Sequence, residues 1–313
     1  MTRYLIQRIV GMIAVMFTVV TIVFVIVRVA PGDPAAVMLG PDATPADIAA
    51  LRERLGLDRP LVVQYVYFLG QLLRGDLGQS IFLNMPVLSA LAERAEPTFF
   101  LTVFSIFIAS AIALPVGILA AYRRGSLFDQ LATTLAMLAA SIPSFWLGLI
   151  LIQVFAVRLG WFPVSGYGGP GAPFLVRLTH LVLPALALGI VSSALITRFT
   201  RASMLDVLND DYVRTARSKG MGEFRVVMKH AFKNALIPVL TVIGLTVALL
   251  VSGAVVTETV FGLPGVGNLV VSAVLRRDYP VIQGALLVIA ALYVLINFAI
   301  DMLYLTIDPR VRY

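Results

Sequence analysis

The chain has 313 residues, of which 59% are hydrophobic and 13% are charged, and its formal net charge is +7. Soluble domains contain about 25% charged residues, so this composition excludes a water-soluble or intrinsically disordered protein. The absence of cysteine excludes disulfide scaffolds, thiolate metal sites and cysteine nucleophiles. With His180 and His230 as the two histidines, we expect no metal centre. The composition is typical of a protein that crosses a membrane several times.

Six long intervals without charged residues mark the predicted membrane spans. Each is 19 to 28 residues long, which is enough for the helix of about 20 residues that crosses ~30 Å of hydrocarbon. The intervals are 9–27, 97–122, 130–157, 178–197, 234–257 and 279–300. The apolar interval 259–275 contains Pro264 and several glycines, so we expect a partly buried or re-entrant excursion there. The predicted fold is an all-α integral membrane protein with six transmembrane helices.

The basic residues predict which side of the membrane each segment occupies. With the N-terminus inside, segments 1–8, 123–129, 198–233 and 301–313 are cytoplasmic, and they hold 14 Lys and Arg against 7 Asp and Glu. The exterior segments hold 10 of each, so the whole positive excess falls on one face. Because cytoplasmic loops are enriched in Lys and Arg, both termini are predicted to lie in the cytoplasm.

The long exterior segment 28–96 separates the first two spans and carries its own helix signals. Thr44, Pro45 and Asp47 have the spacing of an N-cap, a proline in the first turn and an acidic third residue, so a short helix begins there. A second helix begins after Pro60. Its apolar face suits the membrane interface or the top of the helical bundle, and a plain cap on the bundle is the alternative.

The most informative segment is the long cytoplasmic loop 198–236. We predict two helices in it, 206–219 and 223–236, joined by Gly220 and Gly222, which permit a tight reversal. In the second helix, basic residues recur every four positions on one face and apolar residues line another. An electrostatic anchor on lipid phosphates needs neither the glycines nor the apolar stripe, and the cations are not interleaved with an aromatic stacking platform for nucleic-acid bases. The pattern favours a docking element for a cytoplasmic protein.

Two segments of this loop, 212–220 (YVRTARSKG) and 230–238 (HAFKNALIP), resemble the EAA loop of ABC importer permeases, and specifically the dipeptide and oligopeptide branch. Arg214 replaces the glutamate of the general family motif, as is usual in that branch, so the acidic contact is absent. Five further signatures agree in order along the chain. They are PGDP at 31–34, GDLGQS at 75–80, LGWFP at 159–163, RDYP at 277–280 and IDPRVRY at 307–313. The resemblance therefore extends over the chain from end to end.

The resemblance implies partners, domains and site residues. The partners are a second homologous permease subunit, two cytoplasmic ATPase subunits docked on the loop, and an exterior solute-binding protein. Residues 1–92 would hold the first span and the exterior segment, 93–304 the permease domain, and 305–313 a cytoplasmic tail. The residues implied to couple to the ATPase are Tyr212, Thr215, Ala216, Arg217, Lys219, Gly220, His230 and Asn234. No cofactor is expected on this chain, because the ATPase subunits would bind ATP and magnesium.

The sequence offers no motor and no catalytic residue of its own. The phosphate-binding pattern Gly-x-x-x-x-Gly-Lys-[Ser/Thr] is absent, so ATP-driven transport would need another polypeptide. A proton- or sodium-coupled carrier normally places carboxylates near the middle of the membrane and shows internal repeats, and neither feature is visible. Gln153, Glu258 and Asn297 are the polar residues that we predict to line the path or its gate.

We therefore predict a multi-pass permease subunit of the bacterial cytoplasmic (inner) membrane that imports dipeptides or oligopeptides by alternating access. The chain is not an enzyme by itself, and separate ATPase subunits docked on residues 206–236 supply the energy. The main alternative keeps the class and changes the cargo to glutathione, nickel or another small solute. A self-sufficient secondary transporter or channel is the second alternative.

Overall fold

The computed structural model describes the chain except for residues 1, 30–33, 41–42, 55 and 308–313. The described part is helical, with no strand in it and one isolated bridge between Gln79 and Pro86. The elements are α1 (Thr2–Val29), α2 (Pro34–Leu39), α3 (Pro45–Arg54), α4 (Leu61–Leu73), α5 (Val87–Tyr122), α6 (Leu127–Ser141), α7 (Ser144–Leu151), the π-helix η1 (Ile152–Arg158), α8 (Phe174–Leu208), α9 (Asp211–Ser218), α10 (Glu223–Arg225), the π-helix η2 (Val226–Ala231), α11 (Phe232–Val260), α12 (Val266–Arg276) and α13 (Tyr279–Ile307). The predicted all-α fold is confirmed.

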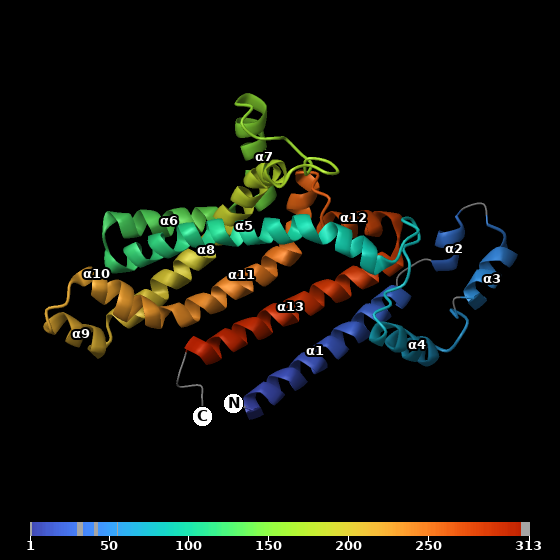
Figure 1. Ribbon diagram of the computed structural model, residues 1–313, viewed down its shortest axis with the longest axis horizontal. Helices are drawn as coiled ribbons and strands as arrows, with labels where there is room; N and C mark the ends of the chain where they lie inside the picture. The colour runs from blue at the N-terminus through green and yellow to red at the C-terminus, as the bar shows by residue number, and fades with distance from the viewer. Residues whose placement is uncertain (1, 30–33, 41–42, 55, 308–313) are drawn as a thin grey trace.

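Five of the described helices, α1, α5, α8, α11 and α13, are long and apolar enough to cross a membrane. The third predicted span, 130–157, is not one straight helix, because α6 and the arm formed by α7 and η1 are bent by 96° (Figure 1). Pro143 has no N–H and disfavours helical backbone at the residue before it, and Ile142 is extended with ψ of 125°. The described helices therefore give five crossings, or six if the bent pair counts as one, so the predicted number of six stays a prediction.

The bundle is built around α5 and α8, with α11 packed against both and α6 lying along them (Figure 1). Glycines bring these helices together: a Cβ on Gly189 would lie 2.8 Å from the Cβ of Ile108, and one on Gly117 would lie 2.7 Å from the Cβ of Thr200. Small residues permit this close approach of membrane helices. A buried apolar cluster in the bundle includes Leu101, Leu181, Leu183, Leu250, Phe261 and Leu263.

The first span lies at the edge of the bundle, where α1 packs against α13. Arg8 of α1 forms an ion pair with Asp301 of α13 at 3.0 Å, so the start of α1 and the end of α13 lie at the same end of the bundle. The α9–α10 segment lies towards that end as well (Figure 1). This arrangement is what an even number of crossings requires, and the assignment of that end to the cytoplasm stays a prediction.

The opposite end carries the short helices α2, α3, α4 and α12 (Figure 1). The hydroxyl of Thr44 and the carboxylate of Asp47 exchange hydrogen bonds with each other's backbone N–H groups, at 3.3 and 3.2 Å, so the predicted start of α3 is confirmed. The second predicted exterior helix is α4. The apolar interval 259–275 forms the short helix α12, which packs on α5, α11 and α13 and is too short to span.

Candidate functional site

The candidate site is the elbow, by which we mean residues 209–231 between α8 and α11. It differs from the predicted pair of helices at two points. A break at Asn209 and Asp210 separates α8 from α9, because Asp210 is extended with ψ of 148°; the Asn209 side chain donates to the carbonyl of Leu205 at 2.9 Å. Short polar side chains favour such turns over helix interiors. The second predicted helix, 223–236, consists of α10, η2 and the first residues of α11.

The reversal between α9 and α10 depends on Gly220. Its φ of +74° lies in the left-handed region, which costs an L-residue about 1–2 kcal/mol. Its N–H donates to the carbonyl of Arg217 at 2.9 Å, which closes the last turn of α9. Gly222 has a φ of −57°, which any residue can adopt. The glycine turn is therefore present, and Gly220 rather than Gly222 is the position that requires glycine.

The elbow stands on a buried apolar cluster that continues into the bundle. Val213 and Ala216 of α9 point inward and are buried. Ala216 therefore packs in the cluster, and its neighbours in α9 form the exposed surface. The members of the cluster are Ala121, Met204, Val213, Ala216, Val226, Val227, Ala231 and Ala235. Because α5, α8, α9, η2 and α11 all contribute, displacement of the elbow has to displace the ends of three long helices.

The outward face of the elbow is polar and carries two exposed aromatic side chains, Tyr212 and Phe224. The exposed members of the predicted coupling set are Tyr212, Thr215, Arg217, Lys219, Gly220 and Asn234. Arg217 and Glu223 form an ion pair across the turn, with Nη2 and Oε1 2.8 Å apart, and the hydrogen bonds to Glu223 raise the pKa of Arg217. Phe224, which was not predicted as a site residue, is 82% exposed beside this pair. Its position on the apolar stripe of the sequence was the available signal.

Tyr212, His230 and Asn234 meet in one small network. The side-chain amide of Asn234 donates to the hydroxyl of Tyr212 at 2.7 Å and to the carbonyl of His230 at 3.3 Å. The Tyr212 hydroxyl also approaches that carbonyl, at 3.5 Å. The network ties α9 to η2 and to the first turn of α11. Nε2 of His230 is buried and has no hydrogen-bond partner in the described structure.

The three predicted path residues lie on three different elements. Gln153 is exposed on η1, in the arm that points away from α13 in Figure 1. Asn297 is half-buried on α13 and donates to the carbonyl of Tyr293 at 2.8 Å. Glu258 is fully buried near the end of α11. The structure does not bring them together into one lining, and their role in the path stays a prediction.

Glu258 makes a nest with the start of α12. Its carboxylate accepts hydrogen bonds from the hydroxyl of Thr98 at 2.5 Å and from the backbone N–H of Asn268 at 3.0 Å. The Thr98 hydroxyl in turn accepts from the N–H of Val266 at 2.9 Å. A Cβ on Gly265 would lie 2.3 to 2.4 Å from the carboxylate atoms. A buried carboxyl group at the start of α12 therefore joins α5, α11 and α12.

A second buried carboxylate joins two of the sequence signatures that lie far apart in the chain. Asp278, of the 277–280 signature, accepts a hydrogen bond at 2.6 Å from the hydroxyl of Ser80, of the 75–80 signature. The same carboxylate accepts from the N–H of Phe82 at 3.3 Å. The sequence predicted both signatures but not this contact, because Ser80 and Asp278 lie 198 positions apart in the chain.

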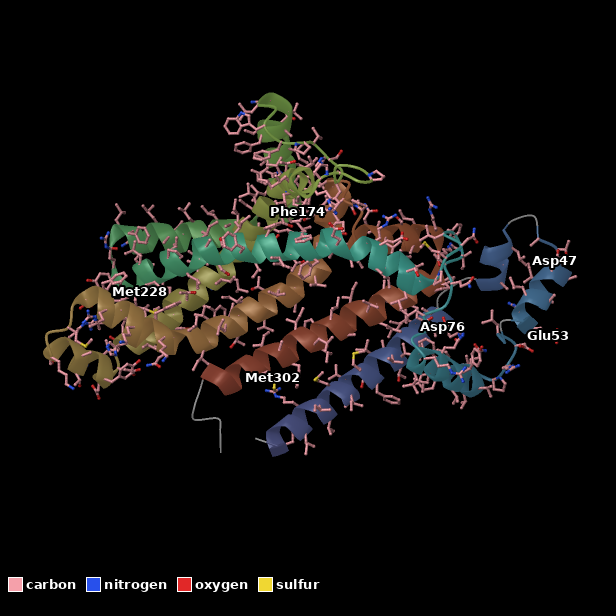
Figure 2. All side chains as sticks on the ribbon, viewed as in Figure 1. Asp47, Glu53, Asp76, Phe174, Met228 and Met302 are labelled. Atoms are coloured by element: carbon pink, nitrogen blue, oxygen red, sulfur yellow. The ribbon has the colours of Figure 1, made fainter. Side chains whose placement is uncertain are left out.

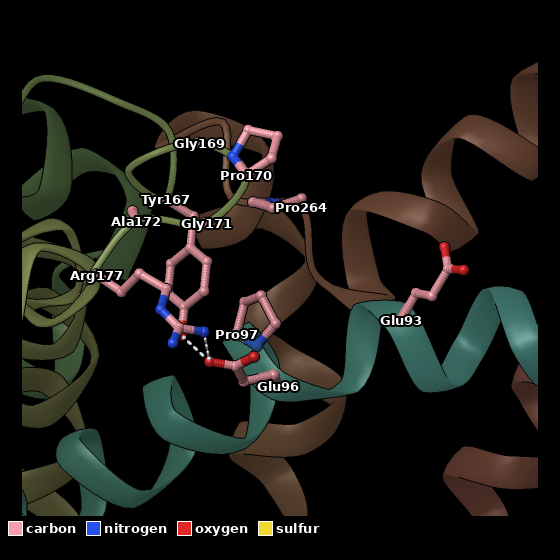
Figure 3. Close-up of a pocket in the computed structure, with 10 residues that line it drawn as sticks. All are labelled: Glu93, Glu96, Pro97, Tyr167, Gly169, Pro170, Gly171, Ala172, Arg177 and Pro264. Atoms are coloured by element: carbon pink, nitrogen blue, oxygen red, sulfur yellow. Dashed lines mark hydrogen bonds and ion pairs between the residues drawn. The ribbon is translucent and has the colours of Figure 1, made fainter. Parts of the chain in front are cut away.

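A polar cluster joins the start of α8 to α5 (Figure 3). Arg177 and the hydroxyl of Tyr167 both donate to the carboxylate of Glu96, and the guanidinium lies 5.9 Å from the centre of the Tyr167 ring. These residues line a pocket of about 340 Å³ together with Pro97 and Pro264. Burial and the nearby Glu96 carboxylate raise the pKa of Tyr167 to about 12, so its hydroxyl remains a donor. Among the described residues no three His, Asp or Glu side chains gather as metal ligands do.

The N-terminal and C-terminal parts of the chain each match a family of known proteins. Residues 113–313 match the family described as binding-protein-dependent transport system inner membrane component. The chain belongs to this family. Residues 1–102 match the N-terminal family of the membrane components of the same transport systems. The chain is thus a translocation component and a multi-pass protein of the bacterial inner membrane, as the EAA-loop resemblance implied.

Three full-length relatives give the family its context. The chain is 46% identical over 310 residues to the "Probable peptide ABC transporter permease protein y4tP" of Sinorhizobium fredii, covering 99% of each chain. It is 41% identical to the dipeptide transport system permease protein DppB of Alkalihalophilus pseudofirmus and 43% identical to the glutathione transport system permease protein GsiC of Escherichia coli O6:H1, covering 100% of each chain in both cases.

A solved structure shares the fold of the bundle. It is an inward-facing conformation of the MetNI methionine ABC transporter, with a TM-score of 0.58 and 20% identity, covering 71% of this chain and 97% of that one. At 20% identity, the similarity shows that the two proteins share a fold and nothing further. The predicted boundary between residues 92 and 93 falls inside α5, which is continuous from Val87 to Tyr122.

Proposed function

We propose that this chain is the transmembrane permease subunit of an ATP-driven importer that carries dipeptides and oligopeptides by alternating access. Two separate ATPase subunits dock on the elbow, bind ATP and magnesium, and hydrolyse the ATP. A second, homologous permease completes the path, and an exterior solute-binding protein delivers the peptide.

The observation that carries the proposal is the construction of the elbow. Polar and aromatic side chains project from a short helix that stands on a buried cluster shared by α5, α8 and α11. A lipid anchor needs charge alone, whereas this surface combines Arg217, Lys219 and Phe224 on a rigid support. A rigid support converts the movement of a docked protein into movement of the spans.

The break in the third predicted span supports the proposal of a second permease subunit. The α6 helix of 15 residues rises ~22 Å at ~1.5 Å per residue, so the 141–144 break falls within the ~30 Å hydrocarbon layer. Ser141 and Pro143 are exposed there, beside Phe145 and Trp146. Non-helical backbone at that depth is tolerated where protein or water covers it, but not lipid. Because the surroundings are apolar, protein is the better cover.

The names of the relatives support the peptide cargo. Relatives of similar identity are named for peptide, dipeptide and glutathione transport. Glutathione is therefore the second candidate cargo, ahead of nickel or another small solute. The ligand of the binding protein that works with this chain discriminates between these cargoes.

Reconstitution tests the proposal. The chain is co-expressed with its partner subunits, placed in proteoliposomes, and assayed for uptake of a labelled dipeptide and for ATP hydrolysis. We expect uptake with the complete complex, ATP and the loaded binding protein, and none with this chain alone. Uptake by this chain alone would favour the self-sufficient channel or carrier.

A further inference from the structure

The exterior helix α4 packs one face against the membrane-spanning helix α1. The hydroxyls of Thr21 and Tyr65 lie 2.6 Å apart, and the ring of Phe24 lies 5.1 Å from that of Tyr65 and 5.6 Å from that of Phe68. The apolar contact continues into α13, where Leu287 shares a buried cluster with α1 and α4. The position of α4 is therefore fixed relative to the spans.

These contacts set the depth of α4 in the membrane. Thr21 and Phe24 belong to the charge-free interval 9–27, and α1 ends at Val29. At ~1.5 Å per residue, Phe24 lies ~8 Å and Thr21 ~12 Å below that end. Because α4 packs against these two residues, it lies at the level where acyl chains meet headgroups and not in the water above them.

The opposite face of α4 is apolar and has no cover in the described structure. Its exposed side chains are Leu61, Val62, Val63, Val66, Tyr67 and Leu73, with Val62 73% and Leu73 89% exposed. Arg59 and Arg74, which flank the helix at its two ends, are exposed as well. An apolar face bracketed by two cations at this depth has the composition of a helix that lies in a bilayer interface.

We propose that α4 is embedded in the outer leaflet, with its apolar face among the acyl chains and with Arg59 and Arg74 on the phosphates of anionic phospholipids. Lipid is the occupant because α4 sits on α1, the span at the edge of the bundle, on the side away from α5 and α8 (Figure 1). The two arginines give the headgroup preference, since anionic lipid attracts basic residues at its surface. Asp58 and Asp76, which are exposed beside them, oppose this attraction, so the comparison of headgroups below decides it.

The absence of cysteine makes the test direct, because a single introduced cysteine takes the only nitroxide label. Val62→Cys and Leu73→Cys are labelled in the full chain in liposomes of phosphatidylglycerol and phosphatidylcholine. Collisions with oxygen report acyl chains, and collisions with a water-soluble nickel chelate report water. Glu53→Cys on α3, which lies beyond the end of the bundle in Figure 2, is the matched control.

We expect labels at positions 62 and 73 to collide with oxygen severalfold more, and with the nickel chelate severalfold less, than the label at position 53. Nickel collisions equal to those at position 53 would place α4 in water and overturn the proposal. Low collision rates with both reagents, with immobilised spectra, would overturn it in favour of protein cover.

A second experiment tests the contact between the two arginines and the lipid headgroups. With Val62→Cys, we expect deeper burial in liposomes with phosphatidylglycerol than in phosphatidylcholine alone, and Arg59→Gln with Arg74→Gln to abolish the difference. Equal depth in both lipids before the arginines are replaced would overturn the headgroup contact.

Discussion

The hydroxyl of Tyr212 lies 2.7 Å from the side-chain amide of Asn234, and this contact joins the elbow to the first turn of α11. The same helix carries Glu258 near its other end, where the carboxylate holds the start of α12. One continuous helix therefore connects the proposed ATPase dock with the buried nest at the opposite end of the bundle. We expect a push on the elbow to reach the opposite end of the bundle through α11.

Replacement of Tyr212 by Phe should loosen the elbow without removing its apolar support. The variant loses hydrogen bonds to Asn234 and to the carbonyl of His230, worth about 0.5–1.5 kcal/mol each. We expect a small fall in thermal stability in detergent and a larger fall in the ATP hydrolysis that the loaded binding protein stimulates. The control is Tyr67→Phe, at an exposed tyrosine of α4. An unaltered stimulation in Tyr212→Phe would contradict the role of this contact in coupling.

Gly220→Ala should impair transport while Gly222→Ala does not. In the first variant the alanine has to adopt a φ of +74°. This conformation costs about 1–2 kcal/mol, so we expect the turn to change its shape. Gly222 has a φ of −57° and open space around it, so alanine fits there. Uptake into proteoliposomes, corrected for the amount of inserted protein, measures both. Equal uptake in the two variants would separate the turn geometry from function.

The nest around Glu258 predicts a strong effect at Gly265. A methyl group there would lie 2.3 to 2.4 Å from the carboxylate, so Gly265→Ala should displace α12 and destabilise the protein by more than about 1 kcal/mol. Gly11→Ala in α1, where no atom lies within 4 Å, should leave stability unchanged or slightly higher. Thermal denaturation followed by size-exclusion chromatography compares the two. Similar midpoints would show that the nest contributes little.

The contact between Ser80 and Asp278 predicts a defect of stability separate from coupling. Ser80→Ala leaves a buried carboxylate short of one hydrogen bond, at a cost of about 1–3 kcal/mol. We expect a lower denaturation midpoint and, for the protein that remains folded, normal stimulation of ATP hydrolysis. Loss of stimulation in the folded fraction would instead connect this exterior contact with the motor.

Local signals in the sequence predicted the helices well, but the sequence did not predict contacts between residues far apart in the chain. The charge-free intervals located five long helices, and Thr44 and Asp47 located the start of α3, because each depends on neighbouring residues. The size of the bend at Pro143 was not predicted, because Pro115 and Pro184 remain inside continuous helices and a proline alone does not decide between a kink and a break.

The candidate site divides along the same line. The glycine turn and the apolar stripe of the elbow follow from the sequence, because both lie within one loop. The inward direction of Ala216 and the meeting of Tyr212 with Asn234 depend on how α9 lies on η2 and α11, which periodicity does not give. Burial of Glu258 was also beyond local signals, since Thr98 and Asn268 approach it from other elements.

Photo-crosslinking from the elbow tests the central claim most directly. A benzophenone amino acid replaces Lys219, exposed at the turn, and Arg123, exposed in the α5–α6 connection, is the control position. After irradiation of native membranes, we predict that the position-219 probe captures an ATP-hydrolysing subunit and that the position-123 probe captures less of it. Adducts at position 219 with lipid alone would contradict the assignment of the elbow as the dock of the motor.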